Sequence, residues 1–208
     1  MEAAHQAIDA GADVLVAQGN EAGGHTGRRP LLPFLVEVRE RWPEITLLAA
    51  GGVATGRALA AVLAAGADGA WMGTPLVATH EAVEVSEPYK QKIVNATAED
   101  SVYTRVFDLL DVKTWGIPAW PDPIAARVIR NETVEEWQDH EENLAANIDS
   151  AAVEFKLHLS QDEMRWRPIY AGPSAGAVHS IRSASDVVRE VCEDAERLLR
   201  ELPGQLLR

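Results

Sequence analysis

Apolar positions near the start of the chain change from a helical to a strand-like pattern. Residues 2–10 repeat alanine and isoleucine at helical spacing, and Gly11 stands where a helix end favours glycine. Residues 14–17 are then apolar without alternation, which is typical of a strand buried on both faces of a parallel sheet. The pattern predicts the end of a helix followed by a buried strand.

The same change of pattern returns twice further along the chain. A helical stretch over residues 30–42 precedes an apolar strand at residues 45–50. A second helical stretch over residues 56–65, with Thr55 as its N-cap, precedes a third strand at residues 69–72. This repeat indicates right-handed βαβ units, and hence an α/β fold with a parallel sheet that is either open or closed into a barrel.

Each of the three predicted strands runs into glycine. The first is followed by residues 18–27, QGNEAGGHTG, which we call the glycine loop. The second is followed by Gly51 and Gly52, and the third by Gly73 and Thr74. Ligands of parallel α/β folds bind at the carboxyl ends of the strands, so the three junctions are expected to face one site.

Two of these junctions carry the pattern of a phosphate site. Gly51 and Gly52 stand ahead of the helix that Thr55 begins, where bare amide groups and the positive end of the helix favour an anion. Gly73 and Thr74 add amides and a hydroxyl at the end of the next strand, where (β/α)₈ barrels commonly hold a cofactor phosphate. Two tight strand-to-helix turns without a ligand are the alternative interpretation.

The glycine loop also carries His25. Histidine is the side chain best suited to transfer protons near neutral pH, and the glycines around it let the backbone approach a ligand closely. The alternative is a surface turn in which His25 is only polar. No metal site is expected, because the other histidines have no metal-ligand partners and are expected to be surface or packing residues. These are His5, His80, His140, His158 and His179.

From about residue 83 the chain changes to polar helical segments broken by prolines. Thr133 and Glu136 form a capping-box pattern that predicts a helix running to about Leu159. An apolar stripe along this helix is expected to pack rather than to contact a cofactor. The stripe consists of Trp137, Leu144, Ile148 and Phe155.

The last part of the chain predicts a loop and a closing helix. Residues 170–180 are rich in glycine and are interpreted as a connecting loop, with a segment that helps to cover the active site, residues 172–176, as the alternative. Residues 185–202 have the pattern of an amphipathic helix that ends at Pro203 and Gly204. Cys192 is expected on the core-facing side of this helix.

The charge and cysteine content of the chain exclude several classes of protein. The 208 residues include 19 basic and 32 acidic side chains, a net charge of −13, which argues against a nucleic-acid or anionic-membrane surface. The single cysteine, Cys192, cannot form an internal disulfide. No apolar run approaches the ~20 residues of a membrane span, and the start of the chain lacks the pattern of a signal peptide. A cytoplasmic protein is expected.

With these junctions in place, the chain resembles the nitronate monooxygenase family, formerly called 2-nitropropane dioxygenases, which are FMN-dependent (β/α)₈ barrels. The resemblance rests on the glycine loop and on residues 49–57 (AAGGVATGR), 66–69 (GADG) and 72–74 (MGT), which match in order and spacing. It implies that residues 1–82 form the C-terminal part of an FMN-binding barrel. Residues 83–208 would form a mainly helical substrate or lid region with a closing helix.

The resemblance also implies roles for particular residues. His25 would be the base that removes the proton next to a nitro group, or would hold the anionic nitronate. Dioxygen then oxidises the nitronate through FMN to a carbonyl compound and nitrite. The family often has glutamine where this chain has Trp71. The implied FMN-binding residues are Gln18 at the flavin ring, Gly23 and Gly24 against the flavin, Gly51, Gly52, Gly73 and Thr74 at the phosphate, and Met72 through its main chain.

By this resemblance the chain is an incomplete family member. Its three strands would be the sixth to eighth of the barrel, whereas a whole barrel needs ~250 residues. Three strands cannot close a barrel, so the strand edges near residues 14–17 are expected to be exposed and to pair with another chain. A homo-oligomer is therefore one possible state of the protein. The expected small molecules are a nitronate or nitroalkane and dioxygen.

Two other functions remain open. A flavin-dependent enoyl-acyl-carrier-protein reductase shares the Glu-x-Gly-Gly-His loop and the Ala-Ala-Gly-Gly junction, but uses a reduced nicotinamide cofactor and an acyl chain. A non-catalytic flavin-binding remnant is the second alternative. Oxygen consumption with a nitronate, compared with nicotinamide oxidation with an enoyl thioester, separates the two enzymes.

Overall fold

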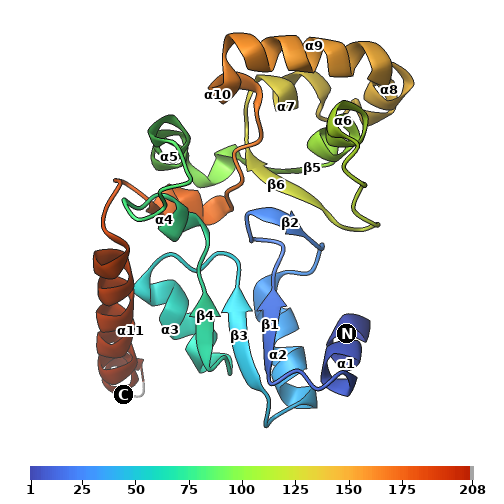
Figure 1. The fold of residues 1–208 in the computed structure, drawn as a ribbon. Helices are drawn as coiled ribbons and strands as arrows, with labels where there is room; N and C mark the ends of the chain where they lie inside the picture. Colours follow the sequence, from blue (N-terminus) through green and yellow to red (C-terminus); the bar gives the residue numbers. More distant parts are fainter. Residues whose placement is uncertain (207–208) are drawn as a thin grey trace.

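The computed structural model describes residues 1–206, in which two three-stranded sheets lie one above the other (Figure 1). The strands are β1 (Val14–Gln18), β2 (Gly24–Thr26), β3 (Thr46–Ala50), β4 (Gly69–Trp71), β5 (Ser101–Thr104) and β6 (Ala125–Ile129). The helices are α1 (Glu2–Asp9), α2 (Leu31–Arg41), α3 (Gly56–Ala64), α4 (Thr74–Val77), α5 (Glu87–Val94), α6 (Val106–Trp115), α7 (Glu132–Trp137), α8 (Glu141–Ala146), α9 (Ile148–Gln161), α10 (Glu163–Trp166) and α11 (Ala184–Leu206), with 3₁₀ turns η1 (Ala98–Asp100) and η2 (Pro173–Ala177).

The first sheet has the order β1-β3-β4, and all its strands are parallel. Its helices α2 and α3 connect consecutive strands, which confirms the predicted α/β repeat. Thr55 is the N-cap of α3, as predicted, and its side chain accepts a hydrogen bond from the Ala58 N–H at 3.2 Å. The three strands therefore end side by side at one edge of the sheet (Figure 1).

Only one face of this sheet is buried. Leu15 and Leu47 point into the core under α2 and α3, whereas Val14 and Val16 are 45% and 41% exposed. The prediction that both faces of the first strand are buried is therefore wrong. An apolar run without alternation is typical of a sheet with other elements packed on both of its faces. In the described chain, elements pack on only one face of this sheet. The result is an apolar open face on the first sheet.

The second sheet has the order β2-β6-β5 and is antiparallel. Its strand β2 comes from the glycine loop, so this loop links the two sheets. The expectation of mainly helical structure after residue 83 missed β5 and β6, because β6 is buried at four of its five positions and shows no alternation, and β5 mixes polar and apolar residues over only four positions. These strands pack against α6 and the helices α7 to α9 around Phe107, Val128 and Phe155.

The predicted helix from Thr133 to Leu159 is interrupted. Asn131, not Thr133, caps α7, by accepting from the Val134 N–H at 3.1 Å. The Thr133 hydroxyl instead donates to the Trp166 carbonyl at 2.8 Å. Asp139 has a φ of +66°, which ends the regular helix between α7 and α8. The apolar stripe packs as predicted, with Leu144 and Phe155 buried and Trp137 and Ile148 against them.

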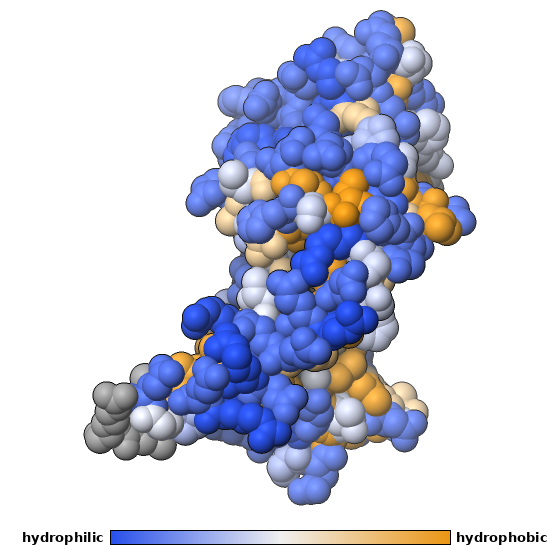
Figure 2. Space-filling view, turned by 90° about the vertical axis from the view of Figure 1, so that its left-hand side faces the viewer, coloured by the Kyte–Doolittle hydropathy of each residue, from blue (hydrophilic) through white to orange (hydrophobic). Residues whose placement is uncertain are grey.

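Helix α11 lies beside α3 and continues through Pro203, so the predicted stop at Pro203 is wrong. Its buried face consists of Val191, Ala195 and Leu198, which are four and three residues apart. Cys192 is exposed because it stands one position round the helix from this face, so its predicted burial is also wrong. The outer side of α11 is mostly hydrophilic (Figure 2). Among residues 1–206, no helix combines the length and apolarity that a membrane crossing requires.

Candidate functional site

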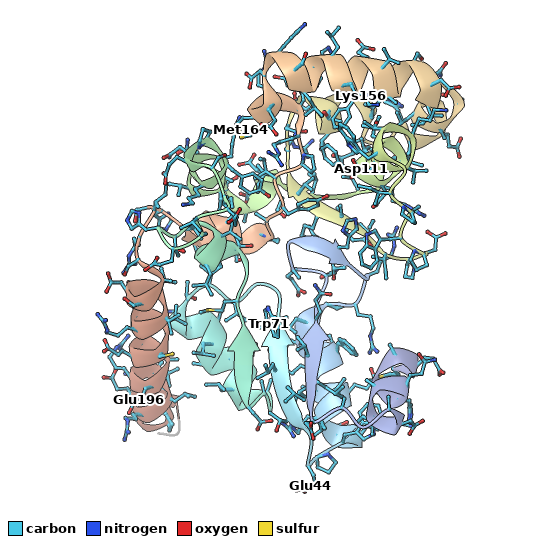
Figure 3. All side chains as sticks on the ribbon, in the orientation of Figure 1. Glu44, Trp71, Asp111, Lys156, Met164 and Glu196 are labelled. Atoms are coloured by element: carbon cyan, nitrogen blue, oxygen red, sulfur yellow. The ribbon has the colours of Figure 1, made fainter. Side chains whose placement is uncertain are left out.

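A cavity of about 260 Å³ opens at the carboxyl ends of β1, β3 and β4. The three glycine junctions meet there, as the sequence predicts for a parallel α/β fold. Trp71, at the end of β4, is 63% exposed and also lines this cavity (Figure 3). Six of the predicted site residues line it: Gln18, Gly23, Gly51, Gly52, Gly73 and Thr74.

The backbone at this cavity suits an anion. Gly51 and Gly52 have φ values of +104° and +72°, a left-handed conformation that favours glycine. Within the described part of the chain, the N–H groups of Gly51, Gly52 and Gly73 donate to no protein acceptor. A Cβ on Gly73 would meet no atom within 4 Å, so a ligand has room beside it. These amides could donate to a phosphate group.

Thr55 of the predicted phosphate pattern, and Met72 and Gly24 of the implied flavin contacts, do not line the glycine cavity. Thr55 and the start of α3 line a separate pocket of about 530 Å³ between α3 and α11, and they are not among the residues that line the glycine cavity. Met72 packs against the core of the first sheet. Gly24, with a φ of +80°, begins β2 and pairs with Arg127. Neither Met72 nor Gly24 lines the glycine cavity.

The segment after α10 forms one wall of the cavity through Tyr170 and Ser174. A Cβ on Gly172 would lie 2.1 Å from the Glu21 carbonyl oxygen, so the two backbones are in direct contact. The Gly172 N–H donates to the buried Thr74 hydroxyl at 3.2 Å, which leaves the hydroxyl hydrogen to donate to a ligand. The favoured interpretation of residues 170–180 as a simple connecting loop is therefore wrong, and the alternative, in which residues 172–176 help to cover the site, agrees with the structure.

His25 lies on β2, outside the set of residues that line the glycine cavity. Its Nε2 is 2.7 Å from Oδ1 of Asp108 on α6, and its ring stacks on Trp120 with the centroids 4.8 Å apart. The ring of Tyr170 lies 5.9 Å from the His25 ring and also lines the cavity. Tyr170 thus connects His25 to the site at the strand ends.

The sequence interpretation missed four residues of this cluster: Asp108, Asp111, Trp120 and Tyr170. A signal for two of them was available. Asp108 and Asp111 interrupt the apolar run at residues 106–112 with a spacing of three, which places both on one face of a helix. Figure 3 shows Asp111 on α6, in the half of the molecule that contains the second sheet.

Burial shapes the electrostatics of the cluster. Desolvation, together with the charge of Asp108, raises the pKa of Asp111 to about 6, and His25 opposes this shift. Desolvation and then the two aspartates raise the pKa of Tyr170 to about 12, although Arg167 lowers it. Tyr170 therefore keeps its proton near neutral pH and is not a base there.

Replacement of Asp111 by asparagine should stabilise the protein at neutral pH. The unfolded chain has the ordinary pKa of 3.8 and the folded protein a pKa of about 6, so the wild type loses stability as the pH rises from 4 to 6. Because the side chain is partly exposed, we expect a gain of about 1 kcal/mol in the variant. Urea unfolding at pH 7 should show this gain, and at pH 4 the gain should vanish. Asp13→Asn, at an exposed carboxylate that makes no ion pair within residues 1–206, is the control.

The chain is similar to known proteins over nearly its whole length. The family model for nitronate monooxygenase matches residues 1–194. Nitronate monooxygenase npaC of Metarhizium robertsii is 33% identical over 213 residues, which cover 93% of this chain and 55% of that protein. FabK from Thermotoga maritima has a TM-score of 0.77 at 27% identity, covering 99% of this chain and 61% of FabK. Nitroalkane oxidase from Streptomyces ansochromogenes has a TM-score of 0.74 at 28% identity, covering 97% and 56%.

The curated relatives are longer than this chain. It spans about half the length of those it matches, between 52% and 55% of three of them. The family model nevertheless covers residues 1–194, which include all three glycine junctions and His25. The chain therefore belongs to the nitronate monooxygenase family.

Proposed function

We propose that this chain is part of an FMN-dependent enzyme that oxidises alkyl nitronates with dioxygen to a carbonyl compound and nitrite. The observation that carries the proposal is the placement of His25, joined through Tyr170 to a cavity lined by glycine amides. Family membership supports it, as does the nitronate monooxygenase named among the relatives. In this proposal His25 removes the proton next to the nitro group, or holds the nitronate.

The residues present fit FMN. The amides of Gly51, Gly52 and Gly73, with the Thr74 hydroxyl, would hold the phosphate, because they line one cavity and the amides lack protein acceptors in the described residues. Gln18 reaches the cavity from β1 and donates to the His25 carbonyl at 3.4 Å, so it would lie between the flavin and the base. Bound FMN would take up electrons from the nitronate and pass them to dioxygen.

The two parts of the chain would have separate tasks. Residues 1–82 would supply the last strands of a (β/α)₈ barrel, and residues 83–208 would form a mainly helical substrate or lid region with α11, which packs beside α3, as the closing helix. The open face of the first sheet supports this division, because Val14 and Val16 are apolar and exposed, as expected of strands that face a barrel interior. The unpaired edge of β1, an outer strand of this sheet, would also suit a second copy of the chain.

We expect the 208-residue chain alone to contain less than one FMN per chain, because the cavity lies at the edge of an open sheet. The flavin absorbance per chain after purification measures this, beside a version that also contains the N-terminal half of the family enzyme. The longer version should contain stoichiometric FMN. Stoichiometric FMN in the short chain would contradict the proposed incomplete barrel.

The flavin-dependent enoyl-acyl-carrier-protein reductase is the second candidate, and the structural likeness to FabK favours it. Oxygen uptake with an alkyl nitronate and nicotinamide oxidation with an enoyl thioester should be measured on the same flavin-loaded protein. We expect oxygen uptake that depends on the nitronate. Turnover of the enoyl thioester alone would overturn the proposed function. Flavin binding without either turnover would indicate a non-catalytic protein.

A further inference from the structure

Asp108 is a buried carboxylate with one hydrogen-bond partner among the described residues. Its side chain is 5% exposed, and its Oδ1 lies 2.7 Å from His25 Nε2. The other oxygen, Oδ2, is buried and makes no hydrogen bond within residues 1–206. A carboxylate that is removed from water without full hydrogen bonding costs free energy. The contribution of Asp108 to folding stability therefore does not explain why this carboxylate is buried beside His25.

The imidazole of His25 is fixed on several sides. The backbone is held by the pairing of His25 with Ala126 on β6. Trp120 stacks on one face of the ring, with an angle of 21° between the two planes. These contacts fix the plane of the ring but do not determine which nitrogen carries the hydrogen. Asp108 lies within hydrogen-bond distance of one nitrogen only, so it can determine the tautomer.

We propose that Asp108 is a positioning residue that holds the Nε2–H of His25 and thereby leaves Nδ1 as the nitrogen that accepts the substrate proton. An ionised carboxylate can only accept, so the nitrogen that faces it must carry a hydrogen. In a neutral imidazole the other nitrogen is then the bare acceptor. The identification of a nitroalkane as the proton donor to Nδ1 rests on the proposed function, whereas the hydrogen bond between His25 Nε2–H and Asp108 does not.

The proposed step balances. The C–H bond next to the nitro group breaks, its electron pair stays on the substrate as the nitronate, and its proton goes to Nδ1. The imidazolium that forms keeps Nε2–H on Asp108, which stabilises the new positive charge. Tyr170, the other ring near His25, does not compete as a base, because its phenol is protonated near neutral pH.

The test observes the ring proton and needs no turnover. In the ¹⁵N-histidine-labelled 208-residue chain, we expect a slowly exchanging ring proton on His25, assigned to Nε2 and close in space to the Cβ protons of Asp108. Asp108→Leu removes the acceptor while filling its space, and should speed exchange of this proton about tenfold or more, since a hydrogen bond to a charged group contributes strongly. Asp108→Asn keeps an acceptor oxygen and should retain the signal.

The chain supplies its own controls. Asp149→Asn, which changes an exposed carboxylate on α9, should leave the proton unchanged. The signals of the other five histidines report whether each variant is folded. A wild-type His25 with its proton on Nδ1, or without a protected ring proton, would overturn the proposal even if Asp108→Leu fails to fold. Unchanged exchange in a folded Asp108→Leu variant would do the same. A failure of nitronate oxidation would overturn the proposed function and leave this assignment standing.

Discussion

Replacement of His25 by alanine should lower the rate of nitroalkane oxidation by about 10²- to 10⁴-fold, the usual contribution of a positioned general base. The variant loses the group that takes the proton and leaves the buried Asp108 without its partner. The loss should be largest with a neutral nitroalkane, because a preformed nitronate has already lost this proton. Oxygen uptake with both substrates, on flavin-loaded protein containing both halves of the enzyme, measures the difference.

The matched control for this prediction is His80→Ala. His80 is exposed and lies after α4, and its backbone N–H donates to the Arg182 carbonyl, a bond that alanine keeps. This variant should retain wild-type rates with both substrates. If His25→Ala lowers both rates equally, His25 holds the nitronate rather than removing a proton. If neither rate changes, the assignment of His25 as a site residue is wrong.

Replacement of Gly172 by alanine should destabilise the protein by about 1–3 kcal/mol, the usual cost of overpacking. The added Cβ would lie 2.1 Å from the Glu21 carbonyl oxygen, which is backbone and cannot turn aside. Movement of either segment would also break the hydrogen bond from the Gly172 N–H to Thr74. The free energy of unfolding in urea and the affinity for FMN should therefore fall together.

Gly27→Ala is the control, because it lies in the same glycine loop and its Cβ would meet no atom within 4 Å. This substitution should change the free energy of unfolding by less than about 0.5 kcal/mol, as surface substitutions usually do. If Gly172→Ala is as stable as Gly27→Ala, then residues 170–174 do not press against the glycine loop. The cavity would then have a different wall.

The first sheet could be predicted from the sequence because its signals are local. Each βαβ unit shows its strand, junction and helix within about thirty residues, and Thr55 caps α3 where the pattern placed it. The meeting of the glycine junctions follows from the topology alone, since parallel strands end at one edge. The buried faces were harder to predict, because an apolar run does not tell how many sides of a strand are covered.

The surroundings of His25 could not be predicted, because they depend on long-range contacts. Asp108 is 83 positions away from His25, and a one-dimensional pattern does not show that α6 folds over β2. The position of Cys192 was missed for a smaller reason: a shift of one residue in the helical stripe moves a side chain by about 100°. Strand β6 is buried at four of its five positions, so it shows no alternation by which it could be recognised.

The phosphate site at the glycine junctions is tested most directly by titrating the purified chain with FMN and with riboflavin, followed by flavin fluorescence. The two ligands share the ring system and differ in the phosphate. We expect FMN to bind at least about tenfold more tightly than riboflavin, because the amides of Gly51, Gly52 and Gly73 would donate to the phosphate and a charge-assisted hydrogen bond contributes ~1.5–3 kcal/mol. Equal affinities for FMN and riboflavin would contradict a phosphate site at these junctions.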